Sequence, residues 1–195
     1  MSHALEIRDL QVTREGHSIC QVSELTVEVN EWLSIQGING SGKSTLLRVL
    51  AGLDQTYQGM VEISEAVRPV GLVQQNPYLF KGTVLFNLLY GTKANQISEP
   101  NSKARTIAQR LGIESLLERD VKHLSGGEKR RVALGRTLIL APKLLLLDEP
   151  FADMDDPGIE AICETLGTLE DSTIVIASPT SLPDKLTLNR SVTIG

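Results

Sequence analysis

The sequence predicts an α/β protein whose core is a parallel sheet covered by helices, with an N-terminal antiparallel β subdomain and an inserted α-helical subdomain. Continuous apolar runs at residues 70–73, 144–147 and 174–177 are typical of strands buried on both faces. Short apolar runs between residues 5 and 29 are separated by turn residues, which indicates hairpins. Helix-forming charged segments fill residues 86–140, which indicates the helical subdomain.

In chain order, the hairpin system over residues 5–29 comes first, and residues 60–63 are expected to join it. Residues 31–36 predict a strand that enters the parallel sheet, and a helix follows it. The apolar residues of that helix recur at helical spacing and are Leu46, Leu47, Val49, Leu50 and Leu53. Residues 192–194 predict a last strand.

The middle third predicts three helices. They cover residues 103–111, ended by Gly112, then 114–119, then 127–140, ended before Pro142. We expect these helices to form a subdomain of about residues 86–140 within one domain of residues 1–195, because the chain can bury one ordinary core.

Residues 37–44 form a complete phosphate-binding loop between a predicted strand and a predicted helix. The glycines let successive backbone N–H groups point into one concavity, where they meet phosphate oxygens. Lys43 is expected to reach the β- and γ-phosphates and Ser44 to bind Mg²⁺. The expected nucleotide-binding residues are Gly37, Asn39, Gly40, Ser41, Gly42, Lys43, Ser44 and Thr45. The alternative is a surface loop that fits the pattern by chance.

Two carboxylates, Asp148 and Glu149, directly follow the apolar run at 144–147. The carboxyl end of that strand is expected to open onto the phosphate loop, which makes the segment a Walker B strand. Asp148 would hold Mg²⁺ through water, and Glu149 would polarise the water that attacks the γ-phosphorus. The alternative is a buried strand followed by a solvated acidic turn.

Composition excludes several classes of protein. No apolar stretch is long enough to cross a bilayer and residues 1–10 carry charge, so we expect a soluble cytoplasmic protein. A net charge of −5 argues against a surface for nucleic acid. Cys20 and Cys163 lie far apart in no metal-like spacing and are expected to be buried reduced thiols.

At residues 124–128, Leu-Ser-Gly-Gly-Glu, the chain resembles the ATP-binding cassette (ABC) family, whose signature sequence stands there intact. The resemblance covers nearly the full length and implies a P-loop NTPase fold of the RecA-like type. It implies that Ser125, Gly126 and Gly127 dock on the nucleotide held by the opposite subunit. The serine before a helix also predicts, by itself, an ordinary N-cap.

Two lesser motifs extend the resemblance. Gln75 matches the family glutamine that contacts Mg²⁺ and the attacking water, whereas Gln74 fits less well because the family glutamine directly precedes the Asn-Pro pair. Asp155 matches the family aspartate at the subunit interface. The expected catalytic residues are therefore Lys43, Gln75 and Glu149. The expected Mg²⁺ ligands are Ser44, Gln75 and Asp148.

Two positions depart from the family pattern. Arg14 stands where an aromatic residue usually stacks on adenine, and a guanidinium plane can still stack there. Pro179 stands in place of the switch histidine and has neither a side-chain donor nor an N–H. Losing one such donor costs on the order of 10² to 10³ in rate, so we expect slow hydrolysis. The competing explanation is an alignment slip at Ser178.

The sequence therefore predicts an ATP-binding and ATP-hydrolysing subunit that uses ATP and Mg²⁺, dimerises around ATP and drives a separate transmembrane permease from the inner face of the membrane. A homodimer without nucleic acid is expected. Residues 77–84 would receive a helix of the partner and look more like exporter-type cassettes than sugar importers. One alternative is a nucleotide-sensing, nearly inactive subunit paired with an active partner. Another is a soluble cassette serving translation or DNA repair.

Overall fold

The computed structural model describes residues 3–195 and consists of two compact units that alternate along the sequence. Unit 1 comprises the chain up to residue 74 together with residues 142–150 and 170–195. Unit 2 comprises residues 75–141 and 151–169. Unit 1 contains all the named strands, and unit 2 contains every α-helix except the first.

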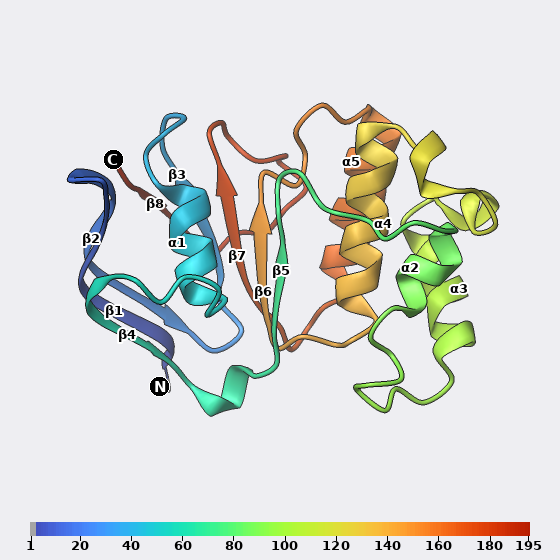
Figure 1. Ribbon diagram of the computed structural model, residues 1–195, viewed down its shortest axis with the longest axis horizontal. Helices are drawn as coiled ribbons and strands as arrows, with labels where there is room; N and C mark the ends of the chain where they lie inside the picture. Colours follow the sequence, from blue (N-terminus) through green and yellow to red (C-terminus); the bar gives the residue numbers. More distant parts are fainter. Residues whose placement is uncertain (1–2) are drawn as a thin grey trace. The chain divides into compact units, whose positions relative to one another are not determined.

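The larger sheet of unit 1 is parallel and has the strand order β5-β6-β7-β3-β8 (Figure 1). Its strands are β3 (Trp32–Gln36), β5 (Val70–Val73), β6 (Leu144–Asp148), β7 (Thr173–Ser178) and β8 (Arg190–Thr193). Every residue of β6 and β7 is buried, as their continuous apolar character predicts. The predicted parallel sheet is confirmed.

The smaller sheet of unit 1 is antiparallel, in the order β2-β1-β4, and contains β1 (His3–Arg14), β2 (His17–Glu28) and β4 (Gln58–Ile63). Glu15 and Gly16 connect β1 to β2 with φ angles of 50° and 80°. Positive φ at both residues is what a two-residue turn between right-twisted strands requires. The predicted hairpin, its turn within residues 14–17 and its third strand are confirmed, but β2 continues through Ser23 and Glu24, where an interruption was expected.

Helix α1 (Lys43–Leu50) follows β3 and lies against the strands of unit 1 (Figure 1). Leu46 and Leu47 are completely buried in a core that the two sheets share. The expected fifth apolar position is wrong, because the helix ends at Leu50 and Leu53 is 67% exposed. Gly52 has a φ of 71°, and this left-handed conformation stops the helix.

Unit 2 is built from four helices, α2 (Val84–Leu89), α3 (Pro100–Arg110), α4 (Gly126–Leu138) and α5 (Asp156–Gly167). Helix α4 packs closely on its neighbours at Gly135. A Cβ there would lie 2.9 Å from Leu88 Cδ2, on α2, and 3.2 Å from Ile107 Cγ2, on α3. The absence of a side chain therefore sets how near these helices approach.

Three 3₁₀ turns complete the fold, namely η1 (Glu65–Val67), η2 (Glu114–Leu116) and η3 (Val121–His123). The predicted helix over residues 114–119 is wrong, since only η2 forms there. Its preceding residue, Ile113, provides no side-chain cap for the first N–H groups of the segment, whereas the equally short α2 is capped by the Thr83 hydroxyl.

Candidate nucleotide-binding site

The parallel sheet of unit 1 brings the phosphate-binding loop and the Walker B carboxylates to one edge. Strand β7 lies between β3 and β6, and its register pairs Ser178 with Gln36 and Ala177 with Asp148. Because all three strands are parallel, the segments that follow them leave the sheet at the same end. The loop after Gln36, the carboxylates and Pro179 therefore share this edge, as expected for ligand binding in open α/β sheets.

Three glycines give the phosphate-binding loop its curvature, with φ angles of 155° at Gly37, 87° at Gly40 and 91° at Gly42. A Cβ at Gly42 would collide with the carbonyl oxygen of Ile19, and one at Gly37 would collide with that of Ile194. Gly40 has open space around it. The loop thus follows a path that only glycine adopts readily, and its backbone at Gly40 stays accessible to a ligand.

Lys43 begins α1 and turns its ammonium group back into the loop. Its Nζ donates hydrogen bonds to the carbonyl oxygens of Gly37, at 2.6 Å, and Ile38, at 2.9 Å. The residue is only 4% exposed, so the cation is held in the concavity. Ser44 is exposed, and the N-terminal N–H groups of α1 lie in the same segment. This is a positively polarised cradle suited to an anion.

One buried polar atom of the loop supports this assignment. The Ser41 Oγ is buried and has no hydrogen-bond partner among residues 3–195. A buried hydroxyl is normally paired, and an unpaired one costs about 1–3 kcal/mol. A phosphate oxygen at the loop would satisfy this hydroxyl. The loop residues therefore fit a nucleotide phosphate.

The two Walker B carboxylates differ in environment. Asp148 is the last residue of β6 and is 6% exposed, whereas Glu149 is partly exposed. Glu149 has a φ of 48°, and its N–H donates to the carbonyl oxygen of Ala177 at 2.9 Å. A non-glycine residue in the left-handed region costs about 1–3 kcal/mol and persists only where neighbours hold it. The bond to β7 is one such restraint, and it fixes the direction in which the carboxylate leaves the sheet.

The segment after β7 contains no imidazole. Ser178 is buried and its Oγ accepts a hydrogen bond from the Thr180 N–H at 3.2 Å, while Pro179 is exposed. His3 and His17 lie in the antiparallel sheet, and His123 ends η3 in unit 2. No histidine of residues 3–195 thus follows a strand of the parallel sheet.

Arg14 forms an ion pair with Asp54. Its Nη2 contacts both carboxylate oxygens of Asp54, at 2.7 and 2.6 Å, and its Nη1 donates to the Thr56 carbonyl oxygen at 3.0 Å. This bidentate arrangement fixes the guanidinium plane at the end of the β1–β2 hairpin. Stacking of that plane on a nucleotide base stays a prediction.

We expect the Arg14–Asp54 pair to make stability depend on pH. The Thr56 N–H and Arg14 lower the pKa of Asp54, so the carboxylate stabilises the fold above its unfolded pKa and that stabilisation disappears as the pH falls through the lower folded value. Asp54→Asn should therefore be less stable than the parent at neutral pH, and the difference should shrink below about pH 4. Urea unfolding across pH 3–7 measures it. A difference that is constant over this range would contradict the assignment.

The signature segment caps α4 in unit 2. The Ser125 Oγ accepts from the Glu128 N–H at 3.2 Å, and the Glu128 Oε2 accepts from the Ser125 N–H at 2.7 Å, which together form a capping box. Ser125 and Gly126 are exposed. The hydroxyl proton of Ser125 stays available as a donor, so the cap and a phosphate contact are compatible.

Unit 2 also contains Gln75, whose backbone contacts the signature helix α4, and Asp155, which precedes α5. The Gln75 carbonyl oxygen accepts from Arg130 Nε of α4 at 3.1 Å. Asp155 is the exposed N-cap residue of α5. The structure thus places the loop and both carboxylates in unit 1, and the signature, Gln75 and Asp155 in unit 2.

The structure singles out one residue that sequence reasoning missed. Arg130 is 8% exposed and donates to the backbone carbonyls of Gln75 and Ala152, which belong to two separate segments of unit 2. The only sequence signal was the triplet of basic residues at 129–131, and a helical pattern predicts a solvated face for such a triplet. Cys20 and Cys163 are free and buried, as expected.

The fold and the loop define a nucleotide-binding protein of the P-loop α/β class. The ABC transporter family model matches residues 20–152. The ATP-binding protein TupC of the tungstate uptake system of Peptoclostridium acidaminophilum is 36% identical over 81% of this chain and 77% of its own length. The chain belongs to the ABC transporter family, in which it is similar to the ATP-binding subunits.

Two further comparisons agree. The lactococcin-A transport/processing ATP-binding protein LcnC of Lactococcus lactis is 33% identical over 87% of this chain, which spans only 26% of that protein. The solved structure of cbiO1 from Clostridium perfringens, part of the ABC transporter complex cbiONQ, matches with a TM-score of 0.74 and 27% identity. That match covers 92% of this chain and 80% of the other.

Proposed function

We propose that this chain binds and hydrolyses ATP, dimerises around it and drives a separate transmembrane subunit. The observation that carries the proposal is the shared edge of β3, β6 and β7, which gathers a phosphate cradle and two carboxylates in unit 1. The family match and the intact signature support it. No helix among residues 3–195 has the length and apolar character of a membrane span.

In the proposed complex, amides of residues 39–45 and the Ser41 hydroxyl bind the phosphates, and Lys43 turns from the loop carbonyls to the β- and γ-phosphates. Ser44, Asp148 and Gln75 would hold Mg²⁺, which neutralises charge on the phosphates when bound. No group of three histidine, cysteine, aspartate or glutamate residues within residues 3–195 forms a metal centre by itself. Such a sparse protein ligand set is typical of Mg²⁺ held largely by phosphates and water.

Glu149 is the residue that activates the attacking water. Its carboxylate accepts a hydrogen bond from a water and polarises it for in-line attack on the γ-phosphorus. Pro179 supplies no donor to the developing negative charge, so we propose that hydrolysis is slow. A nearly inactive nucleotide sensor paired with an active subunit is the second candidate, and Pro179 is the observation that favours it.

Ser125 of one copy would bind the triphosphate held by the loop of the other. Ser125 and Gly126 are exposed at the start of a 13-residue helix, so the Ser125 hydroxyl and the Gly126 N–H can donate to a second molecule. Two such head-to-tail contacts close a symmetric pair, and ATP then stabilises the dimer because it binds only the closed state tightly. We propose a homodimer at the inner face of the cell membrane. The relatives include an uptake system and a transport/processing protein, so the direction of transport is left open.

A groove in unit 2 is the proposed contact with the membrane subunit. Its volume is about 450 Å³, and it is lined by Pro77, Tyr78, Leu79, Lys81, Asp120, Val121, Lys122 and Lys129. Tyr78 is 69% exposed, and its ring meets Phe80 edge-on at 5.4 Å. The groove thus combines an aromatic anchor with three lysines and one carboxylate, which suits a short apolar helix with acidic residues.

Copurification after gentle membrane extraction tests this partner. Lys122→Glu reverses a groove charge and should reduce recovery of the transmembrane subunit by at least about tenfold, because like charges across an interface cost several kcal/mol. Lys103→Glu, on α3 outside the groove, is the matched control and should retain the partner. Recovery of free chain alone from the unmodified protein would overturn the transporter assignment.

A further inference from the structure

The three consecutive basic residues of α4 have three different environments. Lys129 lines the groove of unit 2. The Nη1 of Arg131 donates to the Leu111 carbonyl oxygen at 3.1 Å, at the end of α3. Arg130 is the most buried of the three. Its partners are the two irregular segments that contain Gln75 and Asp155.

Arg130 bridges these segments with separate nitrogens. Its Nε donates to the Gln75 carbonyl oxygen at 3.1 Å, and its Nη1 donates to the Ala152 carbonyl oxygen. Its Nη2 lies 3.5 Å from the Asp153 carboxylate, which is 90% exposed. All four residues belong to unit 2, so these contacts hold within one compact body.

The segment at 152–155 needs such a restraint. Asp153 has a φ of 49°, a strained conformation for a residue other than glycine. Figure 1 shows the connection from β6 to α5, in which this turn lies. The Arg130 fork fixes the carbonyl that precedes the strained residue, and hence the direction in which the chain reaches Asp155.

We propose that Arg130 is a positioning residue that holds the Gln75 segment and the 152–155 segment in fixed geometry relative to the signature helix. Gln75 is the expected contact of Mg²⁺ and the attacking water, and Asp155 is expected at the subunit interface. A single buried guanidinium therefore couples the catalytic glutamine to the interface loop. This inference rests on the proposed function, because the coupling affects turnover only if the chain hydrolyses ATP.

The essential property of Arg130 is its planar guanidinium group, which presents several N–H donors in a fixed geometry. Lysine keeps the charge but presents one nitrogen in place of the rigid fork whose Nε and Nη1 contact the two carbonyls separately. Arg130→Lys should therefore release one of the two segments. Arg131→Lys is the matched control. It changes the adjacent arginine on the same helix, whose partner is the carbonyl of Leu111, the C-cap residue of α3.

Two measurements on the full chain test the inference. In Arg130→Lys, amide exchange should become at least about tenfold faster at Asn76 and at residues 152–154, because a charge-assisted hydrogen bond contributes more than 1.4 kcal/mol. The kcat for ATP should fall by about 10- to 100-fold with KM changed less than threefold, since the loop that binds ATP lies in unit 1. Arg131→Lys should change neither quantity.

Exchange in Arg130→Lys equal to the parent, or an equal loss of kcat in both variants, would overturn the positioning role. A faster exchange with unchanged kcat would also overturn it, because the coupling would then have no catalytic consequence. Absence of turnover in the parent chain would refute the proposed hydrolysis itself. In that case the amide exchange of Arg130→Lys would still test whether Arg130 holds the Gln75 segment and the 152–155 segment together.

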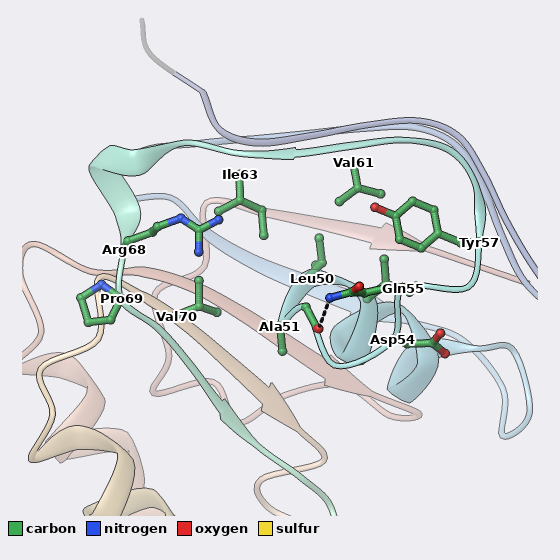
Figure 2. A pocket seen from close by; sticks show the side chains of 12 residues that line it. Leu50, Ala51, Asp54, Gln55, Tyr57, Val61, Ile63, Arg68, Pro69 and Val70 are labelled. Atoms are coloured by element: carbon green, nitrogen blue, oxygen red, sulfur yellow. Dashed lines mark hydrogen bonds between the residues drawn. The ribbon is translucent and has the colours of Figure 1, made fainter. Parts of the chain in front are cut away.

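A cavity in unit 1 shows no comparable set of convergent contacts. It has a volume of about 780 Å³ and lies in unit 1 between the end of α1, β4 and the segment at 68–70 (Figure 2). Arg68, at its wall, already pairs with Glu65 at 3.1 Å, and its side chain is 52% exposed. The polar groups on the wall do not converge on a common point that would define a ligand, and Asp54 is already bound to Arg14.

Discussion

Glu149→Gln is expected to lower steady-state ATP hydrolysis by about 10²- to 10⁴-fold, the usual contribution of a positioned general base. Glutamine keeps the size of the side chain and the backbone bond to Ala177, and removes only the charge that polarises the water. Affinity for ATP should change little, because the loop at 37–45 is intact. Phosphate release and equilibrium ATP binding are the two measurements.

Glu164→Gln serves as the control for this substitution. Glu164 is an exposed residue of α5 in unit 2, so its neutralisation should leave turnover within about twofold of the parent. Equal rates for Glu149→Gln and the parent would show that another group activates the water. Loss of ATP binding in Glu149→Gln would instead assign the carboxylate to nucleotide affinity and contradict its role as base.

Pro179→His is expected to raise turnover by about 10²- to 10³-fold, the magnitude that one preorganised donor contributes to a developing charge. Residue 179 directly follows β7, whose neighbours in the sheet are β3 and β6, so an imidazole there leaves the sheet between the phosphate loop and Glu149. The measurement is kcat at saturating Mg²⁺-ATP.

Pro179→Ala separates the imidazole from the backbone effect of removing proline. Alanine restores an N–H and removes the ring constraint without adding a side-chain donor. It should stay within about tenfold of the parent if the side chain is what matters. A parent without turnover and an active Pro179→His would favour the nucleotide sensor. Equal rates in all three proteins would refute the slowed-hydrolysis account.

Much of unit 1 could be predicted because its signals are local. A buried parallel strand needs a continuous apolar run, and the residues at 144–147 and 174–177 meet that condition without reference to any other part of the chain. The phosphate loop is equally local, since its glycines are required by the path of the backbone itself. Both were therefore visible in the sequence.

One error has a local cause, and two omissions concern tertiary contacts. The periodicity of α1 extended to Leu53, but Gly52 ended the helix first and left that leucine exposed. Arg130 was missed because its acceptors are backbone carbonyls 22 and 55 residues away, which carry no side-chain signal. The ion pair of Arg14 could not be predicted either, because its partner, Asp54, lies 40 residues further along the chain. Residue patterns do not report such pairings.

Nucleotide-dependent association of Glu149→Gln tests the central claim most directly. With Mg²⁺-ATP, sedimentation should show a species of twice the 21.3 kDa chain mass, which disappears when ATP is withdrawn or when Ser125→Arg is added to the same chain. The Ser125→Arg control places a bulky cation where the triphosphate of the other copy should dock. A chain that stays monomeric with Mg²⁺-ATP, or that dimerises equally well with Ser125→Arg, would contradict the proposed ATP-clamped pair.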